Sequence, residues 1–218
     1  MRLIEDTFAG PGGWDEGLRV LGITEHVVGY EWDDAACRTA HAAGHVRVRT
    51  DVTTLHPPAA WGRISSPPCT KFSTAGSGVG LRALDTLAAG IRTIFDGHDP
   101  ATVIEQTRGA VYPTCLSYRT DVNAKRDPGR MWNTERVELA ARMDAFTTAL
   151  VLEPARLMIQ APSMWIALEQ VPAVLPLWKV YAECLRPLGY SVWVGILNSA
   201  DYGVPQTRRR AILTAHRE

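Results

Sequence analysis

The sequence predicts an α/β fold with a mostly parallel sheet and helices on both faces. Short apolar runs typical of strands alternate with helical patterns along the chain. The first of these runs leads through a glycine turn into a helix, and polar residues follow the ends of several others. Strands that alternate with helices are typical of parallel sheets, whose strands are joined by helical crossovers.

The first strand–turn–helix unit contains the glycines. Leu3 to Phe8 is a strand candidate, Ala9-Gly10-Pro11-Gly12-Gly13 is the turn, and helical spacing runs from Trp14 to Leu21. Glycine lets the backbone turn tightly, and amide groups at a helix start can receive polar atoms of a ligand. The spacing G-x-G-G differs from the dinucleotide motif G-x-G-x-x-G, which argues against NAD or FAD.

The second unit places acidic residues after its strands. A strand at Val27 to Tyr30 ends in Glu31 and Trp32, before a small-residue helix from Ala35 to Ala43. Glu31 is placed to bind a ribose diol. Trp32 either stacks on a purine or caps the junction of helix and sheet. Val46 to Arg49 alternates like a third strand, and Asp51 after it is a cofactor contact or a turn-former.

The fourth strand candidate, Gly62 to Ser65, leads into Ser66-Pro67-Pro68-Cys69. Two prolines hold the backbone before Cys69 extended, which suits a nucleophile, although most free cysteines are simply buried apolar residues. Parallel sheets bind ligands at the carboxyl ends of their strands. The residues expected to converge there are Gly10 to Gly13, Glu31, Asp51 and Cys69.

The middle and the end of the chain are less regular. Residues 74–133 contain a helix candidate at Leu81 to Phe95 and a polar, basic stretch, and we expect a long insertion or lid. An amphipathic helix is predicted from Val137 to Ile159, with Leu139, Met143, Phe146, Leu150 and Leu157 on its apolar face. A strand at Trp165 to Leu168 ends in Glu169, and a helix follows from Pro172 to Leu188, bent or delayed by Pro176. The last candidates are strands at Val192 to Leu197 and Ala211 to Thr214.

Composition limits the class of protein. A chain of 218 residues, 46% hydrophobic and 21% charged, predicts one globular domain over residues 1–218. Its formal net charge of zero indicates no polyanionic partner by itself. The four cysteines are widely spaced, so we expect no disulfide framework and no metal site. The absence of a long apolar run or signal peptide predicts a reduced, cytoplasmic protein without a membrane segment.

The predicted crevice has a reactive chemistry. Cys69 and Glu169 follow strands expected to be neighbours, and Arg208 and Arg210 lie in a loop that could reach the same place. Nearby arginines favour a thiolate, the reactive form of cysteine. A glutamate can hydrogen-bond or protonate the substrate, and an arginine can hold an oxygen. Without a histidine in the pattern, a Cys-His hydrolase is less attractive.

Six ordered motifs resemble those of the DNA cytosine carbon-5 methyltransferases. They are Asp6 with Phe8 to Gly13, Glu31-Trp32, Asp51-Val52, Pro67-Pro68-Cys69 with Phe72-Ser73, Glu169-Gln170-Val171, and Gln206-x-Arg208-x-Arg210. The resemblance implies a Rossmann-like S-adenosylmethionine-dependent methyltransferase fold. It also implies an enzyme whose cysteine attacks carbon 6 of a cytosine flipped out of DNA, because the target atoms are inaccessible in the stack.

Roles follow from the resemblance position by position. It implies that Cys69 is the nucleophile, that Glu169 contacts the ring-nitrogen and amino edge of cytosine, that Arg210 holds the base carbonyl oxygen, and that Arg208 and Gln206 shape the site. S-adenosylmethionine, converted to S-adenosylhomocysteine, is the implied cofactor. Its implied contacts are Phe8, Ala9, Gly10, Gly12, Gly13, Glu31, Trp32, Asp51, Val52, Pro68 and Leu150.

Three departures from the family pattern qualify this reading. Thr70 and Gln170 replace the usual Gln and Asn, the segment after Cys69 is long, and the sequence stops at Glu218 before a target-recognition domain and a final motif. We therefore expect a catalytic subunit of a modification system that needs a second chain to recognise its DNA sequence. The alternatives are a non-catalytic remnant or regulatory subunit, and a methyltransferase acting on cytosine in tRNA.

Overall fold

The structure is a computed structural model that describes residues 2–23, 26–68, 70–73, 77–126 and 133–218. The chain divides into two compact units. The first consists of Met1–Pro67 with Glu153–Glu218, and the second is Pro68–Leu152. The prediction of one catalytic domain over residues 1–218, with an insertion or lid at about 74–133, stays a prediction.

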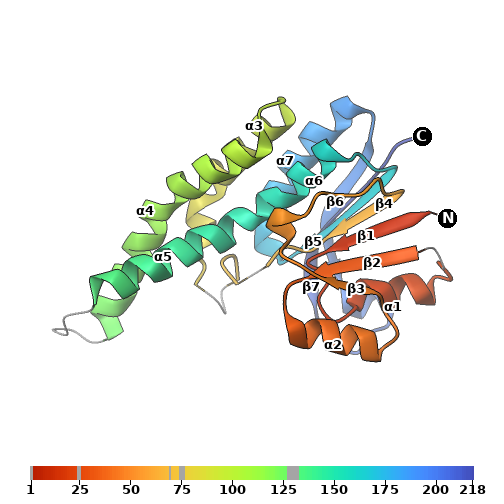
Figure 1. The fold of residues 1–218 in the computed structure, drawn as a ribbon, viewed down its shortest axis with the longest axis horizontal. Helices are drawn as coiled ribbons and strands as arrows, with labels where there is room; N and C mark the ends of the chain where they lie inside the picture. The colour runs from red at the N-terminus through yellow and green to blue at the C-terminus, as the bar shows by residue number, and fades with distance from the viewer. Residues whose placement is uncertain (1, 24–25, 69, 74–76, 127–132) are drawn as a thin grey trace. The chain divides into compact units, whose positions relative to one another are not determined.

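The first unit is built on a seven-stranded sheet in the order β3-β2-β1-β4-β5-β7-β6 (Figure 1). The first five strands in this order are parallel, and β7 is antiparallel to both β5 and β6. This arrangement confirms the predicted mostly parallel α/β sheet. The strands are β1 (Leu3–Thr7), β2 (His26–Glu31), β3 (Arg47–Arg49), β4 (Gly62–Ser65), β5 (Trp165–Gln170), β6 (Ser191–Asn198) and β7 (Arg209–His216).

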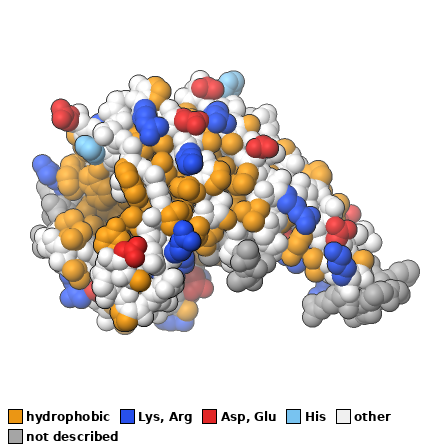
Figure 2. Space-filling model, turned by 180° about the vertical axis from the view of Figure 1, so that it is seen from behind, with side chains coloured by type: hydrophobic (Ala, Val, Ile, Leu, Met, Phe, Trp, Pro, Cys, Tyr) orange, Lys and Arg blue, Asp and Glu red, His pale blue; other side chains and the backbone are white. Residues whose placement is uncertain are grey.

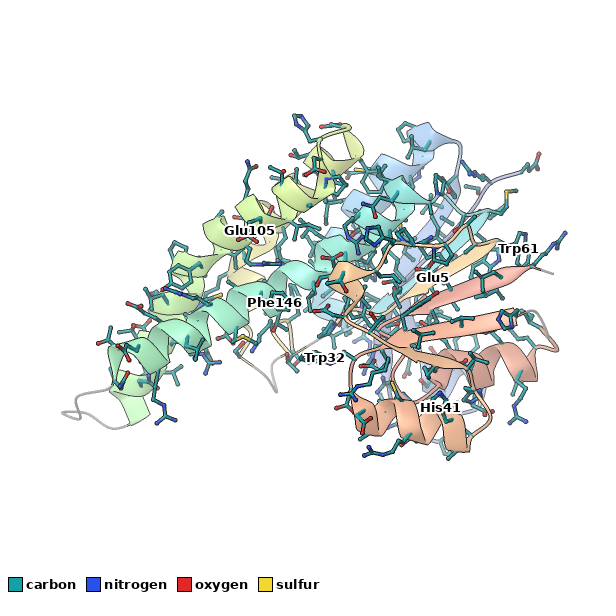
Figure 3. All side chains as sticks on the ribbon, viewed as in Figure 1. Glu5, Trp32, His41, Trp61, Glu105 and Phe146 are labelled. Carbon is teal, nitrogen blue, oxygen red and sulfur yellow. The ribbon has the colours of Figure 1, made fainter. Side chains whose placement is uncertain are left out.

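The strand order brings the predicted site segments to one edge. The chain passes from β1 outward to β2 and β3 and returns to β4 on the other side of β1. Since these strands are parallel, their carboxyl ends lie at the same edge, where open α/β sheets bind ligands. Figure 3 labels Trp32, after β2, at this edge and Trp61, before β4, at the opposite edge.

Helices cover both faces of this sheet. The helices α1 (Gly13–Val20) and α2 (Asp34–Ala42) lie on one face, and α6 (Glu153–Gln160) and α7 (Leu175–Leu185) lie on the other (Figure 1). On the α1 face, Leu18 packs with Ile4, Ile64 and Ala167. On the other face, the Trp178 indole of α7 donates to the carbonyl of Ala211 over 3.2 Å. Short 3₁₀ turns are η1 (Val52–Thr54), η4 (Pro172–Val174), η5 (Arg186–Leu188) and η6 (Ser199–Tyr202).

The second unit consists of helices. These are η2 (Val79–Ala83), α3 (Leu84–Phe95), α4 (Pro100–Arg126), α5 (Thr134–Ala149) and η3 (Leu150–Leu152). No helix was predicted over residues 100–126, which form a single 27-residue helix with Pro113 inside it. The buried side chains of this helix recur at helical spacing, at Val103, Thr107, Val111 and Cys115.

The predicted long helix over residues 137–159 was also wrong in two respects. The 3₁₀ turn η3 separates α5 from α6, so the helix is not continuous. Leu139 and Met143, expected on its apolar face, are 62% and 52% exposed. The buried face of α5 instead carries small residues around the carboxylate of Asp144. Small side chains allow helices to pack closely. A prediction that looks for large apolar residues at helical spacing does not find such a face.

The surface carries both signs of charge. In Figure 2 the Lys and Arg side chains are interspersed with Asp and Glu, and hydrophobic atoms lie between them. This distribution agrees with a formal net charge of zero. Among the described residues, no helix has both the length and the apolar character required to cross a membrane.

Candidate active site

The glycine loop after β1 is held in an unusual backbone conformation. Phe8 has a φ of 59°, which places a non-glycine residue in the left-handed region, and Gly10 and Gly12 have φ values of 55° and 115°. Such a conformation costs a bulky residue on the order of 1 kcal/mol and persists where surrounding contacts impose it. At Gly12 a Cβ atom would lie 2.5 Å from the His45 ring, so glycine is required there for space as well as for φ.

Arg47 on β3 supplies the contacts that hold this loop. Its Nε donates to the carbonyl of Gly10 over 3.1 Å, while its Nη1 and Nη2 lie 3.1 and 2.6 Å from the carboxylate oxygens of Asp15 in α1. The arginine side chain is fully buried. It occupies the space beside Gly29, where a Cβ would lie 2.3 Å from Nη1. A glycine in β2 therefore makes room for the arginine that joins the loop to the helix.

Glu31 connects the end of β2 to the same loop. One carboxylate oxygen accepts from the Gly10 amide, and the other accepts from the amides of Trp32 and Asp33, each over 2.9 Å. The residue is only 9% exposed, whereas Trp32 beside it is 68% exposed. Oε1 accepts two of these hydrogen bonds and Oε2 accepts one, so Oε2 keeps a lone pair that can accept from a ligand hydroxyl.

The segment after β3 is held from α6. Arg156 donates to the carbonyls of Val52 and Leu55 over 2.7 and 2.9 Å. Val52 is buried, and the exposed Asp51 accepts hydrogen bonds from the amide and hydroxyl of Thr53. Asp51 is thus a turn-former in this structure, and its predicted cofactor contact stays a prediction.

Asp6, at the end of β1, is a buried acid. The residue is fully buried, and neither carboxyl oxygen has a hydrogen-bond partner among the described residues. Burial raises the pKa of Asp6 to about 8, with the negative charge of Asp15 adding to the shift and Arg47 opposing it. The carboxyl group is therefore largely protonated at neutral pH.

The end of β4 is joined to the end of β5. These strands are parallel neighbours, as expected for the strands that precede Cys69 and carry Glu169. The buried amide of Gln170 donates to the carbonyl of Pro67 over 2.6 Å, and its oxygen accepts from the Val171 amide. Gln170, a departure from the family pattern, thus supports the segment that leads to the cysteine. Cys69 itself lies outside the described residues.

Glu169 and the arginine motif lie together. The Nε of Arg210 is 2.7 Å from Oε1 of Glu169, and Nη2 of Arg208 is 3.9 Å from the same oxygen. Arg210 is the second residue of β7, whose register places Glu169 opposite Ile212. Arg208 lies just before the strand, where its amide donates to the Asn198 side chain over 3.1 Å. Arg208 lies in the loop as expected, whereas Arg210 is already in β7; both lie near Glu169, and their catalytic roles stay predictions.

The first unit can accommodate a cofactor at this edge. The glycine loop, Glu31 and the Asp51 segment follow three adjacent parallel strands. Beside Gly10 and Gly13, an added Cβ would meet no atom within 4 Å in the part of the chain that the structure describes, apart from adjacent residues and the α1 backbone, so these residues leave space next to the loop. The open backbone, the acceptor oxygens of Glu31 and the exposed indole of Trp32 fit the amino-acid, ribose and purine parts of an adenosyl cofactor. Two further expected contacts, Pro68 and the buried Leu150, belong to the second unit.

Sequence reasoning missed Arg47 and the burial of Asp6. In the sequence Arg47 is recognisable only as part of an alternating strand. A signal is present, because a glycine stands in the middle of the preceding strand, and the register pairs Gly29 with Arg47. Asp6 is recognisable only as the residue that precedes the glycine motif. Nothing in the sequence indicates that its carboxyl group has no hydrogen-bond partner among the described residues.

Solved structures with the same fold include methyltransferases. The Dnmt2 methyltransferase of S. pombe matches with a TM-score of 0.52 at 16% identity, covering 99% of this chain and 49% of that chain. The Entamoeba histolytica methyltransferase EhMeth matches with a TM-score of 0.55 at 14% identity, over 99% of this chain and 53% of that one. A Spodoptera frugiperda DNMT2 variant gives a TM-score of 0.55 at 14% identity, over 100% and 50%. The chain thus spans about half the length of these proteins.

Sequence comparisons agree with the fold. A stretch of 37 residues is 54% identical to the DNA (cytosine-5)-methyltransferase PliMCI of Paracentrotus lividus, covering 17% of this chain and 2% of that protein. The sequence profile described as C-5 cytosine-specific DNA methylase matches residues 2–104 and 141–218. Since the matched residues make up most of the 218, the chain belongs to the C-5 cytosine-specific DNA methylase family.

Proposed function

We propose that the chain is the catalytic part of a DNA cytosine carbon-5 methyltransferase in which Cys69 is the nucleophile. Family membership gives the class of reaction and S-adenosylmethionine as the methyl donor. The observation that carries the assignment of the site is the Gln170–Pro67 hydrogen bond, which joins the ends of the strands that bear Glu169 and lead to Cys69. Glu169, the residue before Gln170, also forms an ion pair with Arg210.

The cofactor is assigned to the glycine-loop edge of the first unit. S-adenosylmethionine, when bound, supplies an electrophilic methyl group and leaves as S-adenosylhomocysteine. The Gly10 to Gly13 backbone, with Phe8 and Ala9 before it, would receive the amino-acid part of the cofactor. Glu31 would accept from the ribose hydroxyls, and Trp32 with Asp51 and Val52 would contact the purine. Pro68 and Leu150 complete the proposed set.

The reaction assigned to Cys69 is an addition followed by an elimination. The thiolate forms a bond from sulfur to carbon 6 of the cytosine, and the electron pair of the ring double bond moves to carbon 5, which then takes the methyl group. Glu169 contacts the ring-nitrogen and amino edge and favours this addition, and Arg210 holds the carbonyl oxygen. A base then removes the carbon-5 proton, the double bond re-forms, and the bond between sulfur and carbon 6 breaks.

We further propose that recognition of the DNA sequence depends on a second chain. Base-edge contacts need side chains that reach into a groove of the duplex, and none of the residues assigned above to the cysteine chemistry or to the cofactor has that role. A second chain would deliver the flipped base to the catalytic part. The chain on its own would then bind cofactor but methylate DNA slowly.

Radiolabelled methyl transfer tests these proposals. The protein is incubated with labelled S-adenosylmethionine and either cytosine DNA or tRNA, with and without the product of the neighbouring gene. We expect label in DNA, more with the second protein, and none with Cys69→Ala. Label in tRNA instead of DNA would overturn the DNA assignment. Absence of label under every condition, with Cys69→Ala identical to the parent, would indicate a non-catalytic remnant or regulatory subunit.

A further inference from the structure

A buried carboxylate in the second unit holds the residue two positions after Cys69. Asp144 of α5 is 1% exposed, and the Nζ of Lys71 lies 2.6 Å from its Oδ1. Arg119 of α4 contacts the same carboxylate with two donors, Nε to Oδ2 over 2.6 Å and Nη2 to Oδ1 over 2.8 Å. Burial alone would raise the pKa of Asp144, but the hydrogen bonds and charges of Arg119 and Lys71 lower it, so the group is ionised.

The backbone and the next side chain are held as well. The Gly80 amide donates to the Lys71 carbonyl over 2.8 Å, and the Ser77 amide donates to the Thr70 carbonyl over 3.2 Å. Phe72 is 1% exposed, and a Cβ at Gly80 would lie 2.7 Å from its ring. The described residues that follow Cys69 are therefore fixed through a salt bridge, backbone hydrogen bonds and a buried ring.

Arg119 comes from a segment that the family profile does not match. Lys71 and Asp144 lie in matched segments, whereas residues 105–140 between them are unmatched. That segment forms most of α4 and the start of α5, which pack side by side (Figure 1). Additional contact between the two helices is made by Arg108, whose guanidinium carbon lies 4.6 Å from the centre of the Phe146 ring. The carboxylate of Asp144 is therefore paired with two side chains. Lys71 comes from the segment that follows Cys69, and Arg119 comes from the unmatched segment.

We propose that Asp144, held by Arg119, is a positioning residue for the catalytic cysteine, acting through Lys71. This rests on the proposed role of Cys69. The unmatched α4–α5 segment is then a support for the nucleophile rather than a nucleic-acid contact. Because a displacement of about 1 Å can cost about 100-fold in rate, a support two residues from a nucleophile can control turnover without touching substrate.

Single-turnover kinetics separate positioning from general stability. The variants are Asp144→Asn and Lys71→Gln, with Glu138→Gln as the matched control, since Glu138 pairs with Arg142 on the exposed side of the same helix. We expect Asp144→Asn and Lys71→Gln each to lower the methyl-transfer rate constant about 10-fold or more. The double variant should be no slower than the slower single one, and the dissociation constant for S-adenosylmethionine should stay within about twofold of the parent. Arg119→Lys keeps the charge but loses the two-donor contact, and its methyl-transfer rate constant should lie between those of the parent and Asp144→Asn.

Loss of stability alone would give a different pattern. It would reduce the amplitude of the turnover, which reports the folded fraction, and leave the rate constant of the folded protein unchanged. Rate constants equal to that of Glu138→Gln would overturn the proposal, as would additive effects in the double variant.

Hydrogen exchange tests the same contacts without activity. Peptides spanning residues 70–80 should exchange faster in Asp144→Asn and Lys71→Gln, while those from β1 and β4 should not change. Unchanged exchange at 70–80 would overturn the inference. If the parent protein transfers no methyl group but exchange rises as expected, the proposed function fails while the structural support stands. Faster exchange with an unchanged rate constant would show that the support has no role in catalysis.

Discussion

The buried carboxyl group of Asp6 makes stability depend on pH. Burial first, and then the charge of Asp15, raise its pKa from 3.8 to about 8. In the unfolded chain the group has already lost its proton at neutral pH. The folded state therefore binds more protons between about pH 4 and 8, and the free energy of unfolding falls as pH rises through that window, by up to about 1.4 kcal/mol per pH unit.

Asp6→Asn removes this ionisation. Relative to the parent, the variant should gain stability progressively from about pH 4 to 8, and the difference should be constant above that range. Urea unfolding at a series of pH values measures it, with the exposed Asp96→Asn as the control. A difference between parent and Asp6→Asn that does not change with pH would show that Asp6 is ionised in the folded protein.

The two arginines of the last motif differ in their contact with Glu169. Arg210 is 2.7 Å from the carboxylate, and Arg208 is 3.9 Å away and more exposed. We expect Arg210→Gln to lower kcat/KM about 100-fold, since it removes the charged donor proposed to hold the carbonyl oxygen of cytosine. Arg208→Gln should cost about 10-fold or less. Steady-state methyl transfer checks this order, and a larger loss for Arg208→Gln would contradict the assignment.

At the scale of elements, the glycine loop depends on a neighbouring strand. Arg47 joins the Gly10 carbonyl to Asp15 of α1. Arg47→Lys keeps the charge but loses the planar fork that reaches both partners. The dissociation constant for S-adenosylmethionine should rise about 10-fold, measured by calorimetry. Arg19→Gln is the control, because Arg19 is on α1 and forms an exposed pair with Glu16. Equal affinity in both variants would exclude a role for Arg47 in shaping the loop.

The strands β1 and β4 share a buried ion pair. Arg63 lies 3.0 Å from Glu5, and both side chains are fully buried. Burial lowers the pKa of Arg63 and raises that of Glu5. Burial therefore destabilises each charged form, and the opposite charge of the partner offsets part of this cost. Arg63→Met should cost about 3–5 kcal/mol, because it leaves an unpaired buried acid.

Adding Glu5→Leu to Arg63→Met tests the reason for that loss. The double variant should recover most of the stability, since a buried ion pair can often be replaced by apolar groups with little net change. Urea unfolding of the parent, both single variants and the double variant gives the coupling. If the double variant loses the sum of the two single losses, the residues do not act as a pair.

Strands such as β2 and β5 were predictable from the sequence because each contains a short apolar run that ends in polar residues. The strand β4, for example, was predicted at the bounds that the structure shows. The helix at residues 100–126 was harder to predict. Gly109 and Pro113 are unfavourable inside a helix, and its buried stripe includes Thr107 and Cys115 as well as large apolar side chains. The site motifs identified Glu169 and Arg210, but side-chain contacts such as that of Arg47 depend on register.

At the scale of the molecule, the residues of the proposed site are distributed over two compact units. The unit made of Met1–Pro67 and Glu153–Glu218 carries the glycine loop, Glu31, Glu169 and Arg210. The unit Pro68–Leu152 includes the position of Cys69 and the Lys71–Asp144–Arg119 contacts. The residues proposed for the chemistry on cytosine belong to both units, whereas the proposed cofactor contacts belong mainly to the first. Cofactor binding and methyl transfer should respond separately to variants in the two units.

The central claim is that Cys69 forms a covalent adduct with carbon 6 of cytosine. DNA containing 5-fluorocytosine tests it, because fluorine at carbon 5 cannot leave as a proton does, so the adduct persists after methyl transfer. With S-adenosylmethionine and the second protein present, we expect a complex stable to denaturation that contains this chain, with the DNA attached at Cys69 by peptide mass spectrometry. Methylation of ordinary cytosine DNA without any such complex, or at an equal rate in Cys69→Ala, would contradict the account.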